Sequence, residues 1–234
     1  MNSKYIRMIK IDWNRIPLDS YLLSIESIQS LCELEFTKNI TFFTGENGSG
    51  KSTLLEAIAM AYGLNCEGGT INYQFSTYEQ KLELCENLSI IKGHKRPKMS
   101  YFFRAESFYN MATKSIEYES IYGSKSLHEQ SHGESFMSFL QSFQEDGLYL
   151  MDEPEAALSP QTQLALFVQI SKMAKEGSQF IIATHSPVLL AIPDAEILSF
   201  DKEIHRCLYE ETNSYKIMDM FIRDRDRIVK RLLL

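Results

Sequence analysis

The segment GENGSGKS, residues Gly45–Ser52, constrains the fold of this 234-residue chain more than any other feature. It matches the pattern G-x-x-x-x-G-K-[ST] in full, with a strand pattern at Ile40–Thr44 before it and a helix pattern from Ser52 after it. Glycines let the backbone curl so that its N–H groups point at phosphate oxygens, and the N-terminus of the helix adds positive charge. The segment therefore predicts a strand–loop–helix unit that binds the phosphate chain of a nucleotide.

Residues of this loop have expected roles toward a nucleotide and Mg²⁺. Lys51 supplies a point charge to the β- and γ-phosphates, and the hydroxyl of Ser52 is placed to ligate Mg²⁺. The residues expected to contact the nucleotide here are Gly45, Glu46, Asn47, Gly48, Ser49, Gly50, Lys51, Ser52 and Thr53. A complete match between a strand and a helix is not expected of a glycine-rich turn that binds nothing, so we predict a nucleotide-binding protein whose class depends on other segments.

A second segment, GLYLMDEP, predicts a buried strand that ends in two carboxylates. The apolar run Leu148–Met151 leads directly to Asp152 and Glu153, and Pro154 ends the strand. Ligands of α/β folds bind at the carboxyl ends of parallel strands. Asp152 is thus a candidate ligand for Mg²⁺, and Glu153 is a candidate catalytic residue that polarises the attacking water.

In a third strand pattern, QFIIATHSP, the apolar run Phe180–Ala183 is followed by Thr184 and then His185. A single histidine after a strand is usually structural, but here the strand accompanies a phosphate loop and an acidic strand end. Its imidazole could bond the γ-phosphate or the attacking water, so His185 is a candidate catalytic residue together with Lys51 and Glu153.

Strand and helix patterns alternate over most of the chain, and the strands are apolar on both faces. This predicts an α/β fold with a mostly parallel sheet wrapped by helices. One further strand is expected in residues 4–13, another in AEILSF near the C-terminus, and a helix over Ser159–Ala174 with Ser159 as its N-cap. We expect a single domain over residues 1–234, with a nucleotide-binding core at 1–64 and 143–234 and an inserted subdomain at 65–142.

The composition limits partners and location. A net charge of −7 does not support a broad nucleic-acid face, so DNA is a weakly supported partner. The four cysteines are scattered without C-x-x-C spacing, which fits a reducing compartment. The N-terminus lacks the pattern of a signal peptide, and no run of eighteen apolar residues predicts a membrane span. These features lead us to expect a cytoplasmic protein.

The stretch QSHGES places Ser131, His132, Glu134 and Ser135 close together. A Ser/His/Glu hydrolase is not expected from them, because residues so near in sequence cannot easily adopt the geometry of a catalytic triad. A helix pattern over Glu134–Phe143 follows. Its N-terminus and the Ser131 hydroxyl predict an anion site instead.

Together these motifs resemble those of the ATP-binding-cassette (ABC) class of P-loop ATPases. Gly45–Ser52 resembles Walker A, Leu148–Asp152 resembles Walker B with Glu153 in the place of the catalytic glutamate, Ala157–Ser159 resembles the D-loop and His185 the switch histidine. QSHGES stands where that class has its L-S-G-G-Q signature, 21 residues before Asp152. In this comparison Ser131 and Gly133 match the signature, while His132 and Glu134 replace a glycine and the glutamine. The resemblance implies an ABC-type head with an antiparallel β portion and a small helical subdomain.

More narrowly, the chain resembles the compact, stand-alone bacterial ATPases labelled "AAA family", which are related to the heads of structural-maintenance-of-chromosomes (SMC) proteins. The segments that carry this likeness include GENGSGKSTLLEAIA, FFRAESF, MDEPEAALSP and IIATHSP. The class has a γ-phosphate-sensing glutamine after a middle strand. Here Glu106 is the candidate for that position and for a metal contact, with Arg104 as the alternative. For the aromatic residue that stacks on adenine in this class, Tyr5, Trp13 and Tyr21 all remain candidates.

The leading hypothesis is an Mg²⁺-dependent ATPase that forms an ATP-driven head-to-tail homodimer. Ser131, Gly133 and Glu134 of one copy would contact the ATP held by Lys51 of the other. The alternative is an ATP-switched regulatory module for a co-encoded effector, such as a nuclease, a toxin or a DNA-repair-like protein. An ATPase subunit of a transporter is disfavoured by the short interval between Lys51 and Ser131.

Overall fold

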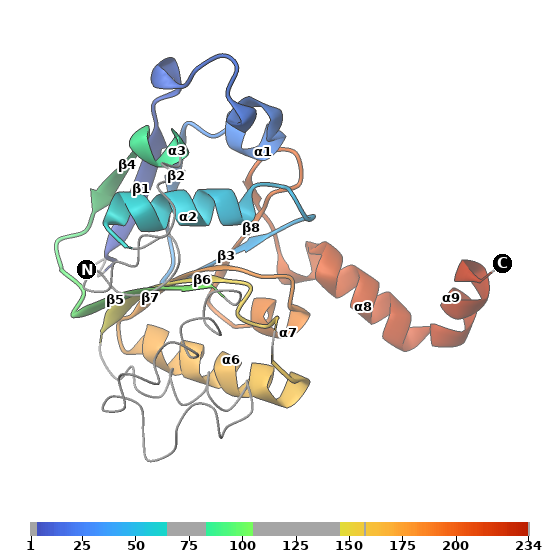
Figure 1. Ribbon diagram of the computed structural model, residues 1–234. Coiled ribbons are helices and arrows are strands. Elements are labelled where there is room, and N and C mark those ends of the chain that lie inside the picture. The colour runs from blue at the N-terminus through green and yellow to red at the C-terminus, as the bar shows by residue number, and fades with distance from the viewer. Residues whose placement is uncertain (1–3, 65–82, 105–145, 157, 234) are drawn as a thin grey trace, which may run out of the picture.

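The computed structural model describes residues 4–64, 83–104, 146–156 and 158–233 (Figure 1). Within these ranges the largest element is a six-stranded sheet with the order β5-β6-β7-β3-β8-β9. Its strands are β3 (Ile40–Thr44), β5 (Met99–Arg104), β6 (Gly147–Asp152), β7 (Gln179–Ala183), β8 (Glu196–Ser199) and β9 (His205–Arg206). Every neighbouring pair is parallel except β8 and β9. The predicted mostly parallel sheet is therefore confirmed.

The central strands are buried along their whole length, which explains their largely apolar sequences. All residues of β3, β6, β7 and β8 are buried. One face of the sheet packs in a core that includes Phe43 and Leu150, and the other face packs in a core that includes Phe42 and Tyr149. Because successive side chains of a strand point to opposite faces, a sheet covered on both faces requires apolar residues at nearly every position.

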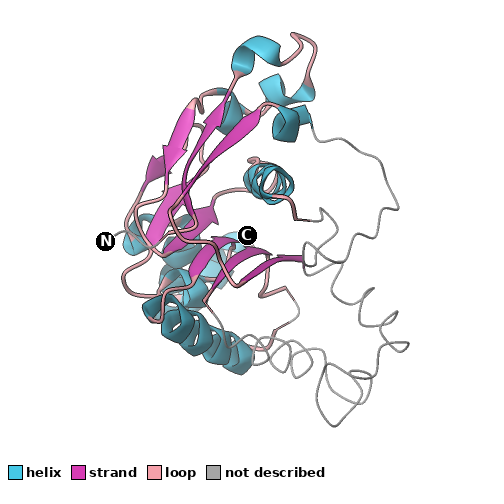
Figure 2. Cartoon of the chain, turned by 90° about the vertical axis from the view of Figure 1, so that its left-hand side faces the viewer, coloured by secondary structure: helices cyan, strands magenta, loops and turns pink. Residues whose placement is uncertain are grey.

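Helices cover both faces of this sheet. Helix α2 (Lys51–Tyr62) contacts β6 and β7 on one face and the strand β4 of a second sheet on its other side (Figure 2). Helix α6 (Pro160–Lys175) lies on the opposite face, and Ser159 caps it by accepting a hydrogen bond from the backbone N–H of Thr162. The other helices in the described ranges are α1 (Glu26–Gln29), α3 (Glu83–Glu86), α7 (Pro187–Leu190), α8 (Asn213–Arg223) and α9 (Arg225–Leu232), with 3₁₀ turns at Trp13–Arg15, Tyr21–Ser24 and Tyr209–Glu211.

The second sheet is the expected antiparallel portion. It has three strands in the order β2-β1-β4, namely β1 (Ile6–Ile11), β2 (Glu33–Glu35) and β4 (Leu88–Lys92). The buried side chain of Gln179 joins the two sheets. Its Oε1 accepts hydrogen bonds from the backbone N–H groups of Tyr5 (2.8 Å) and Ile6 (2.9 Å), and its Nε2 donates to the carbonyl of Ile6 (2.8 Å).

The strands β4 and β5 lie within residues 65–142, the range in which we expect an inserted subdomain. β4 pairs with β1 of the antiparallel sheet, and β5 pairs with β6 of the six-stranded sheet. These pairs join segments that are far apart in the sequence, so local sequence patterns do not predict which strand is the partner. Residues 65–82 and 105–145, which include the expected helix at Glu134–Phe143, lie outside the described residues.

The helices α8 and α9 extend away from the two sheets at the C-terminus (Figure 1). No residue of either helix is buried, and both expose apolar side chains, including Ile222 and Leu232. The sequence analysis did not anticipate this arm. In the described part of the chain, no helix has the length and apolar character needed to cross a membrane.

Candidate nucleotide-binding site

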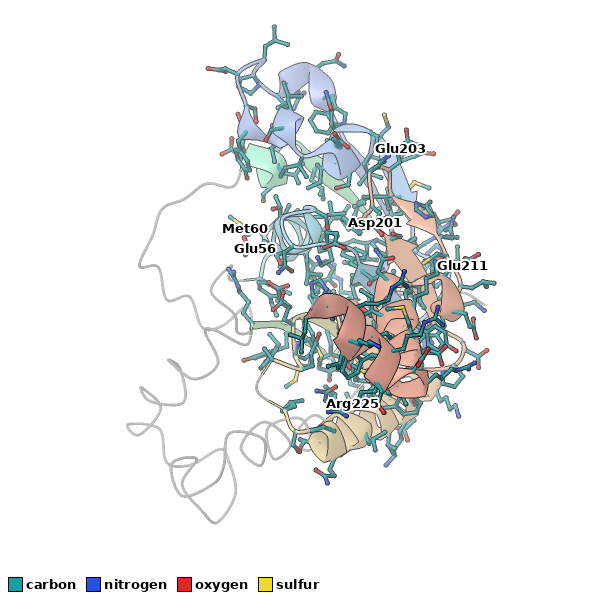
Figure 3. All side chains as sticks on the ribbon, turned by 90° about the vertical axis from the view of Figure 1, so that its right-hand side faces the viewer. Glu56, Met60, Asp201, Glu203, Glu211 and Arg225 are labelled. Carbon is teal, nitrogen blue, oxygen red and sulfur yellow. The ribbon has the colours of Figure 1, made fainter. Side chains whose placement is uncertain are left out.

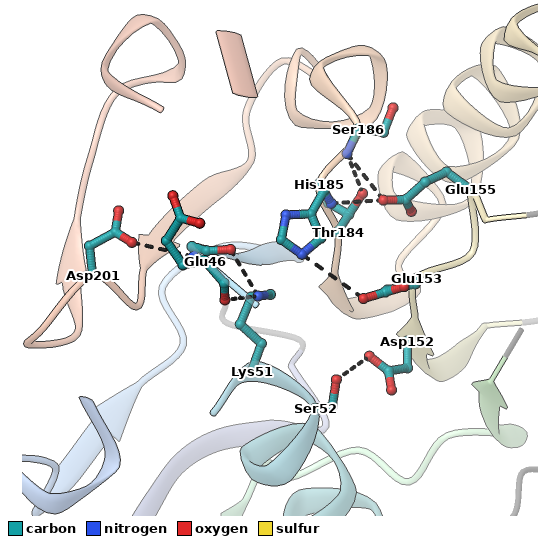
Figure 4. A network of polar contacts seen from close by, with 11 residues as sticks. Glu46, Lys51, Ser52, Asp152, Glu153, Glu155, Thr184, His185, Ser186 and Asp201 are labelled. Carbon is teal, nitrogen blue, oxygen red and sulfur yellow. Dashed lines mark hydrogen bonds and ion pairs between the residues drawn. The ribbon is translucent and has the colours of Figure 1, made fainter. Parts of the chain in front are cut away.

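Three neighbouring strands bring the predicted site residues to one edge of the six-stranded sheet. β6, β7 and β3 are adjacent and parallel, so their carboxyl ends lie at the same edge. β3 leads into the glycine loop Gly45–Ser52, β6 ends at Asp152, and β7 leads to His185. Figure 4 shows these side chains facing one another across the end of the sheet. The sheet topology thus brings the glycine loop next to Asp152, which is 100 positions after Ser52 in the sequence.

The conformation of the glycine loop requires glycine at specific positions. Gly45, Gly48 and Gly50 have φ angles of +142°, +78° and +93°. At Gly50 a Cβ atom would also lie 2.8 Å from Cγ2 of Ile25 and 2.8 Å from Cδ1 of Ile28. Only glycine therefore fits at this point, where the loop turns into α2 against the residues of α1.

Lys51 directs its ammonium into this loop. The residue is buried, and its Nζ donates hydrogen bonds to the carbonyl of Gly45 (2.9 Å) and the carbonyl of Glu46 (2.8 Å). Burial lowers the pKa of Lys51, while the nearby carboxylates of Glu153 and Asp152 act in the opposite direction. These carboxylates favour the charged ammonium, which is the form that binds phosphate.

Ser52 and Asp152 meet where α2 begins and β6 ends. The hydroxyl of Ser52 donates to Oδ1 of Asp152 at 2.9 Å. A hydroxyl and a carboxylate are the hard oxygen donors that Mg²⁺ prefers, and they leave room for water and phosphate oxygens as further ligands. In the described residues no group of three or more His, Cys, Asp or Glu side chains is placed to hold a metal ion.

Arg104, the alternative for the γ-phosphate sensor, lies at the end of β5 directly beside Asp152 in the sheet register. Its Nη1 is 2.5 Å from Oε1 of Glu56 on α2, and its Nε is 3.9 Å from Oδ2 of Asp152. The structure therefore places a cation at the edge of the predicted metal site. Glu106, the first candidate for the same position, lies outside the described residues.

Glu153 and His185 face each other on adjacent turns. The Nε2 of His185 is 3.9 Å from Oε1 of Glu153. Glu153 has a φ angle of +47°, which is uncommon for a residue with a side chain, and its N–H donates to the carbonyl of Ala183 (2.9 Å). Burial, and next the charge of Lys51, lower the pKa of His185, although Glu153 raises it. The imidazole is therefore neutral near pH 7.

Two polar residues of this site were not identified from sequence. Glu155 accepts hydrogen bonds at Oε1 from the backbone N–H groups of His185 (2.7 Å) and Ser186 (3.1 Å). Asp201 follows β8, and its Oδ1 accepts from the N–H of Glu46 in the glycine loop (3.4 Å). The sequence could have identified Asp201, because it is a polar residue shortly after an apolar strand pattern. It could not have identified Glu155, because its hydrogen bond is to the backbone of a turn 30 residues away.

A pocket of about 750 Å³ opens beside the glycine loop. It is lined by the loop, by His185 and by Asp201, and also by residues of the C-terminal segment, including Glu211 and Lys216. Figure 3 labels Asp201 and Glu211. Its volume lies within the range of small-molecule sites, roughly 300–1,000 Å³. The C-terminal segment thus contributes one wall of the space next to the predicted phosphate site, a role that the sequence analysis did not assign.

The other expected contacts have mixed outcomes. Ser131, His132, Gly133, Glu134 and Ala157 lie outside the described residues. Among the candidates for adenine stacking, Tyr5 is 2% exposed in the core, and the indole of Trp13 donates to the carbonyl of Leu31 (2.7 Å). Tyr21 is 53% exposed, so it is the only one of the three with a largely accessible ring.

Comparisons with known proteins agree with this architecture. The family model described as "AAA domain" matches residues 22–181, which is more than half of the chain. A curated relative, the ribose import ATP-binding protein RbsA of Bacillus cereus, is 24% identical over 80% of this chain. The match covers 42% of that relative, so the chain spans less than half of its length.

A solved structure shows the same fold at low sequence identity. A structure titled as an inward-facing conformation of a metal-chelate type ABC transporter has a TM-score of 0.52 and 15% identity, covering 93% of this chain and 88% of that one. The SMC head domain of Thermotoga maritima has a TM-score of 0.47 and 12% identity, covering 87% and 98%. The family match and the fold agree with the site geometry: the chain belongs to the AAA domain family, and its fold is that of an ABC-type P-loop ATPase.

Proposed function

We propose that this protein hydrolyses ATP in a Mg²⁺-dependent reaction at the edge formed by the glycine loop, Asp152, Glu153 and His185. Membership of an ABC-type ATPase family supports nucleotide binding and hydrolysis in general. The observation that carries the more specific proposal is the 2.9 Å contact between Ser52 and Asp152. It brings a hydroxyl and a carboxylate together within reach of the loop that would hold the β- and γ-phosphates.

The residues divide the work of phosphoryl transfer among them. The N–H groups of the glycine loop and the ammonium of Lys51 would bind the phosphates, and Ser52 and Asp152 would hold Mg²⁺. When bound, Mg²⁺ neutralises charge on the phosphate oxygens. Little covalent chemistry is needed from the protein, so its main task is positioning.

Glu153 and His185 are suited to act on the attacking water. Glu153 presents a carboxylate that accepts a hydrogen bond from water and orients its lone pair toward the γ-phosphate. The neutral imidazole of His185 can donate from one nitrogen and accept at the other, which allows it to bridge the water and a phosphate oxygen. Their separation of 3.9 Å leaves the two groups close enough to act on one ligand.

The proposal includes a head-to-tail dimer formed on ATP binding. Ser131, Gly133 and Glu134 of one copy would contact the nucleotide bound at Lys51 of a second copy. What supports this part is the signature-like sequence of these residues and the ABC-type fold. ATP would join the two copies, and hydrolysis would release them.

The substitution Glu153→Gln tests this proposal because it preserves size while it removes the carboxylate. We expect the variant to bind ATP, to hydrolyse it at least about 100-fold more slowly, and to accumulate as a dimer with ATP but not with ADP. Light scattering with ATP, ADP and no nucleotide measures the mass. Absence of hydrolysis in the wild-type protein would refute the ATPase function. A Glu153→Gln variant that stays monomeric with ATP at micromolar concentration would refute only the dimer.

A second candidate function is ATP-switched binding of a partner protein that carries an effector activity. The observation that favours it is the exposed apolar surface of α8 and α9, where Ile217 is 61% exposed, Ile222 is 71% exposed and Leu232 is 75% exposed. We expect a co-encoded partner to bind with ATP and not with ADP, and Ile222→Asp to abolish binding while ATP hydrolysis continues. Equal recovery of the partner with both nucleotides would exclude this function.

A further inference from the structure

The carboxylate of Glu155 connects the two turns that carry Glu153 and His185. Glu155 follows β6 on the same turn as Glu153, whereas His185 and Ser186 follow β7. Oε1 of Glu155 accepts from the N–H of His185 at 2.7 Å and from the N–H of Ser186 at 3.1 Å (Figure 4). One oxygen atom therefore fixes the backbone on both sides of the His185 Cα atom.

The environment makes this connection costly to break. Oε2 of Glu155 is buried and has no hydrogen-bond partner in the described residues. Burial raises the pKa of Glu155, and hydrogen bonds from Thr184 and from the backbone of His185 partly offset this effect. The N–H of Ser186 also donates to Oγ1 of Thr184 at 3.0 Å, so the N–H of His185 is the group that would lose its acceptor with Glu155. A buried N–H group that loses its acceptor costs about 1–3 kcal/mol.

Neighbouring contacts make the two turns a single unit. The N–H of Glu153 donates to the carbonyl of Ala183, which extends the pairing of β6 and β7 past the end of β6. On the far side, the hydroxyl of Ser186 donates to Oε1 of Gln163 on α6 (2.7 Å) and accepts from the N–H of Leu189 (3.3 Å). The backbone of the His185 turn is thus held from β6, from α6 and from α7.

We propose that Glu155 is a positioning residue, which holds the backbone of the His185 turn so that the imidazole lies beside the carboxylate of Glu153. This inference rests on the proposed ATPase function, in which His185 and Glu153 act on the same water. Glu155 acts through His185 and does not touch the nucleotide. A displacement of the imidazole by about 1 Å is expected to slow hydrolysis by on the order of 100-fold.

Variants at position 155 separate the hydrogen-bond acceptor from the charge. Glu155→Ala removes the acceptor, and we expect kcat to fall roughly 10- to 100-fold with the KM for ATP unchanged within about twofold, because the glycine loop and Lys51 are untouched. Glu155→Gln keeps an oxygen at the same place, so kcat should stay within about threefold of wild type. If Glu155→Ala does not fold, Glu155→Asp replaces it, since the shorter side chain withdraws the acceptor and should also lower kcat about tenfold or more.

A double-mutant cycle with His185→Ala distinguishes positioning from a general loss of stability. If Glu155 acts through His185, then Glu155→Ala lowers kcat at least about tenfold in the wild-type background and less than about twofold in the His185→Ala background. Glu196→Ala is the matched control. Glu196 is also a buried carboxylate, bound to Arg206 (2.7 Å) at the opposite end of β8, and its loss should reduce the melting temperature without changing kcat.

The inference is overturned if Glu155→Ala lowers kcat by the same factor in both backgrounds, or if it leaves kcat unchanged. If the wild-type protein does not hydrolyse ATP, the proposed function is refuted. The positioning role of Glu155 is then tested by a measurement that does not depend on hydrolysis. Nuclear magnetic resonance titration of His185 supplies this readout. In Glu155→Ala the pKa of His185 should rise toward its ordinary value of 6.5, and in Glu155→Gln it should stay low. An unaltered His185 titration in Glu155→Ala would show that Glu155 does not position the imidazole.

Discussion

The hydroxyl of Ser52 donates a hydrogen bond of 2.9 Å to Oδ1 of Asp152, although the two residues are 100 positions apart in sequence. This contact joins the first turn of α2 to the last residue of β6. It is the point at which the glycine loop and the acidic strand end become one site.

Asp152→Asn tests whether this contact marks a metal site. An amide is a poorer ligand for Mg²⁺ than a carboxylate, so we expect ATP hydrolysis to fall on the order of 100-fold, with a higher concentration of Mg²⁺ needed for half-maximal activity. ATP binding without metal should persist, because Lys51 and the glycine loop remain. Activity measured against Mg²⁺ concentration provides the test, and an unchanged requirement for Mg²⁺ would exclude Asp152 as a ligand.

The rate should depend on pH through His185. Burial and the charge of Lys51 lower the pKa of His185, so the folded protein keeps the imidazole neutral at a pH below 6.5, where an unfolded chain is already protonated. The contribution of His185 to stability is therefore complete above pH 6.5 and is lost as the pH falls through the lower folded-state pKa.

We accordingly expect the acid limb of the kcat profile to lie below pH 6.5 and to be absent from His185→Gln, which cannot titrate. Measurements of kcat over roughly pH 5 to 8 would show both effects. The same acid limb in His185→Gln would assign the titration to another group.

Gly50→Ala should damage the phosphate loop more than Gly48→Ala does. Gly50 has a φ angle of +93°, and a methyl group there would meet Ile25 and Ile28 at 2.8 Å. The backbone strain of about 1–2 kcal/mol adds to an overpacking cost of about 1–3 kcal/mol. At Gly48 the φ angle is +78° but no atom lies within 4 Å of the added Cβ, so only the strain is expected.

Urea unfolding of both alanine variants, together with ATP affinity, compares these costs. The greater loss of unfolding free energy should belong to Gly50→Ala, with weaker ATP binding as well. If the two variants lose the same unfolding free energy, the close approach of α1 to the loop does not contribute to stability.

Gln179→Leu should weaken the junction between the two sheets. The change removes three hydrogen bonds to the backbone of Tyr5 and Ile6 and leaves their buried polar groups without this partner. We expect the free energy of unfolding to fall by about 2–5 kcal/mol, measured by urea denaturation. Gln161→Leu on the exposed side of α6 is the control and should change it by less than about 0.5 kcal/mol. Equal effects of the two substitutions would argue against Gln179 as a structural link.

The elements with a strong local pattern were predictable. Ile40–Thr44 has the bounds expected of β3, and Ser159 caps α6 as its position before Pro160 predicted. The apolar runs before Asp152 and His185 form the strands β6 and β7. These predictions succeeded because apolar periodicity, glycine and proline act on the backbone within a few residues.

Other features required the tertiary structure. The strand β2 has only three residues. The positions of β4 and β5 in the sheets are set by their pairing with β1 and β6. From the sequence, Tyr5 was one of three candidates for stacking on adenine. The structure shows that its side chain is buried in the core, so its ring is not accessible to a nucleotide. Sequence patterns identify which residues prefer to be buried, but not which partner covers them.

By itself the sequence determined the chemistry of the site, because the glycine loop, the carboxylates and the histidine are each defined by residue type and by their place after a strand. Only the tertiary structure decided how these groups are held. Glu155 accepts hydrogen bonds from the N–H groups of His185 and Ser186, and Asp201 accepts one from the glycine loop. These contacts, like that of Arg104 with Glu56, each join different elements of the fold. Their geometry depends on the order of strands in the sheet, and that order is set by the burial of the whole core rather than by any local segment.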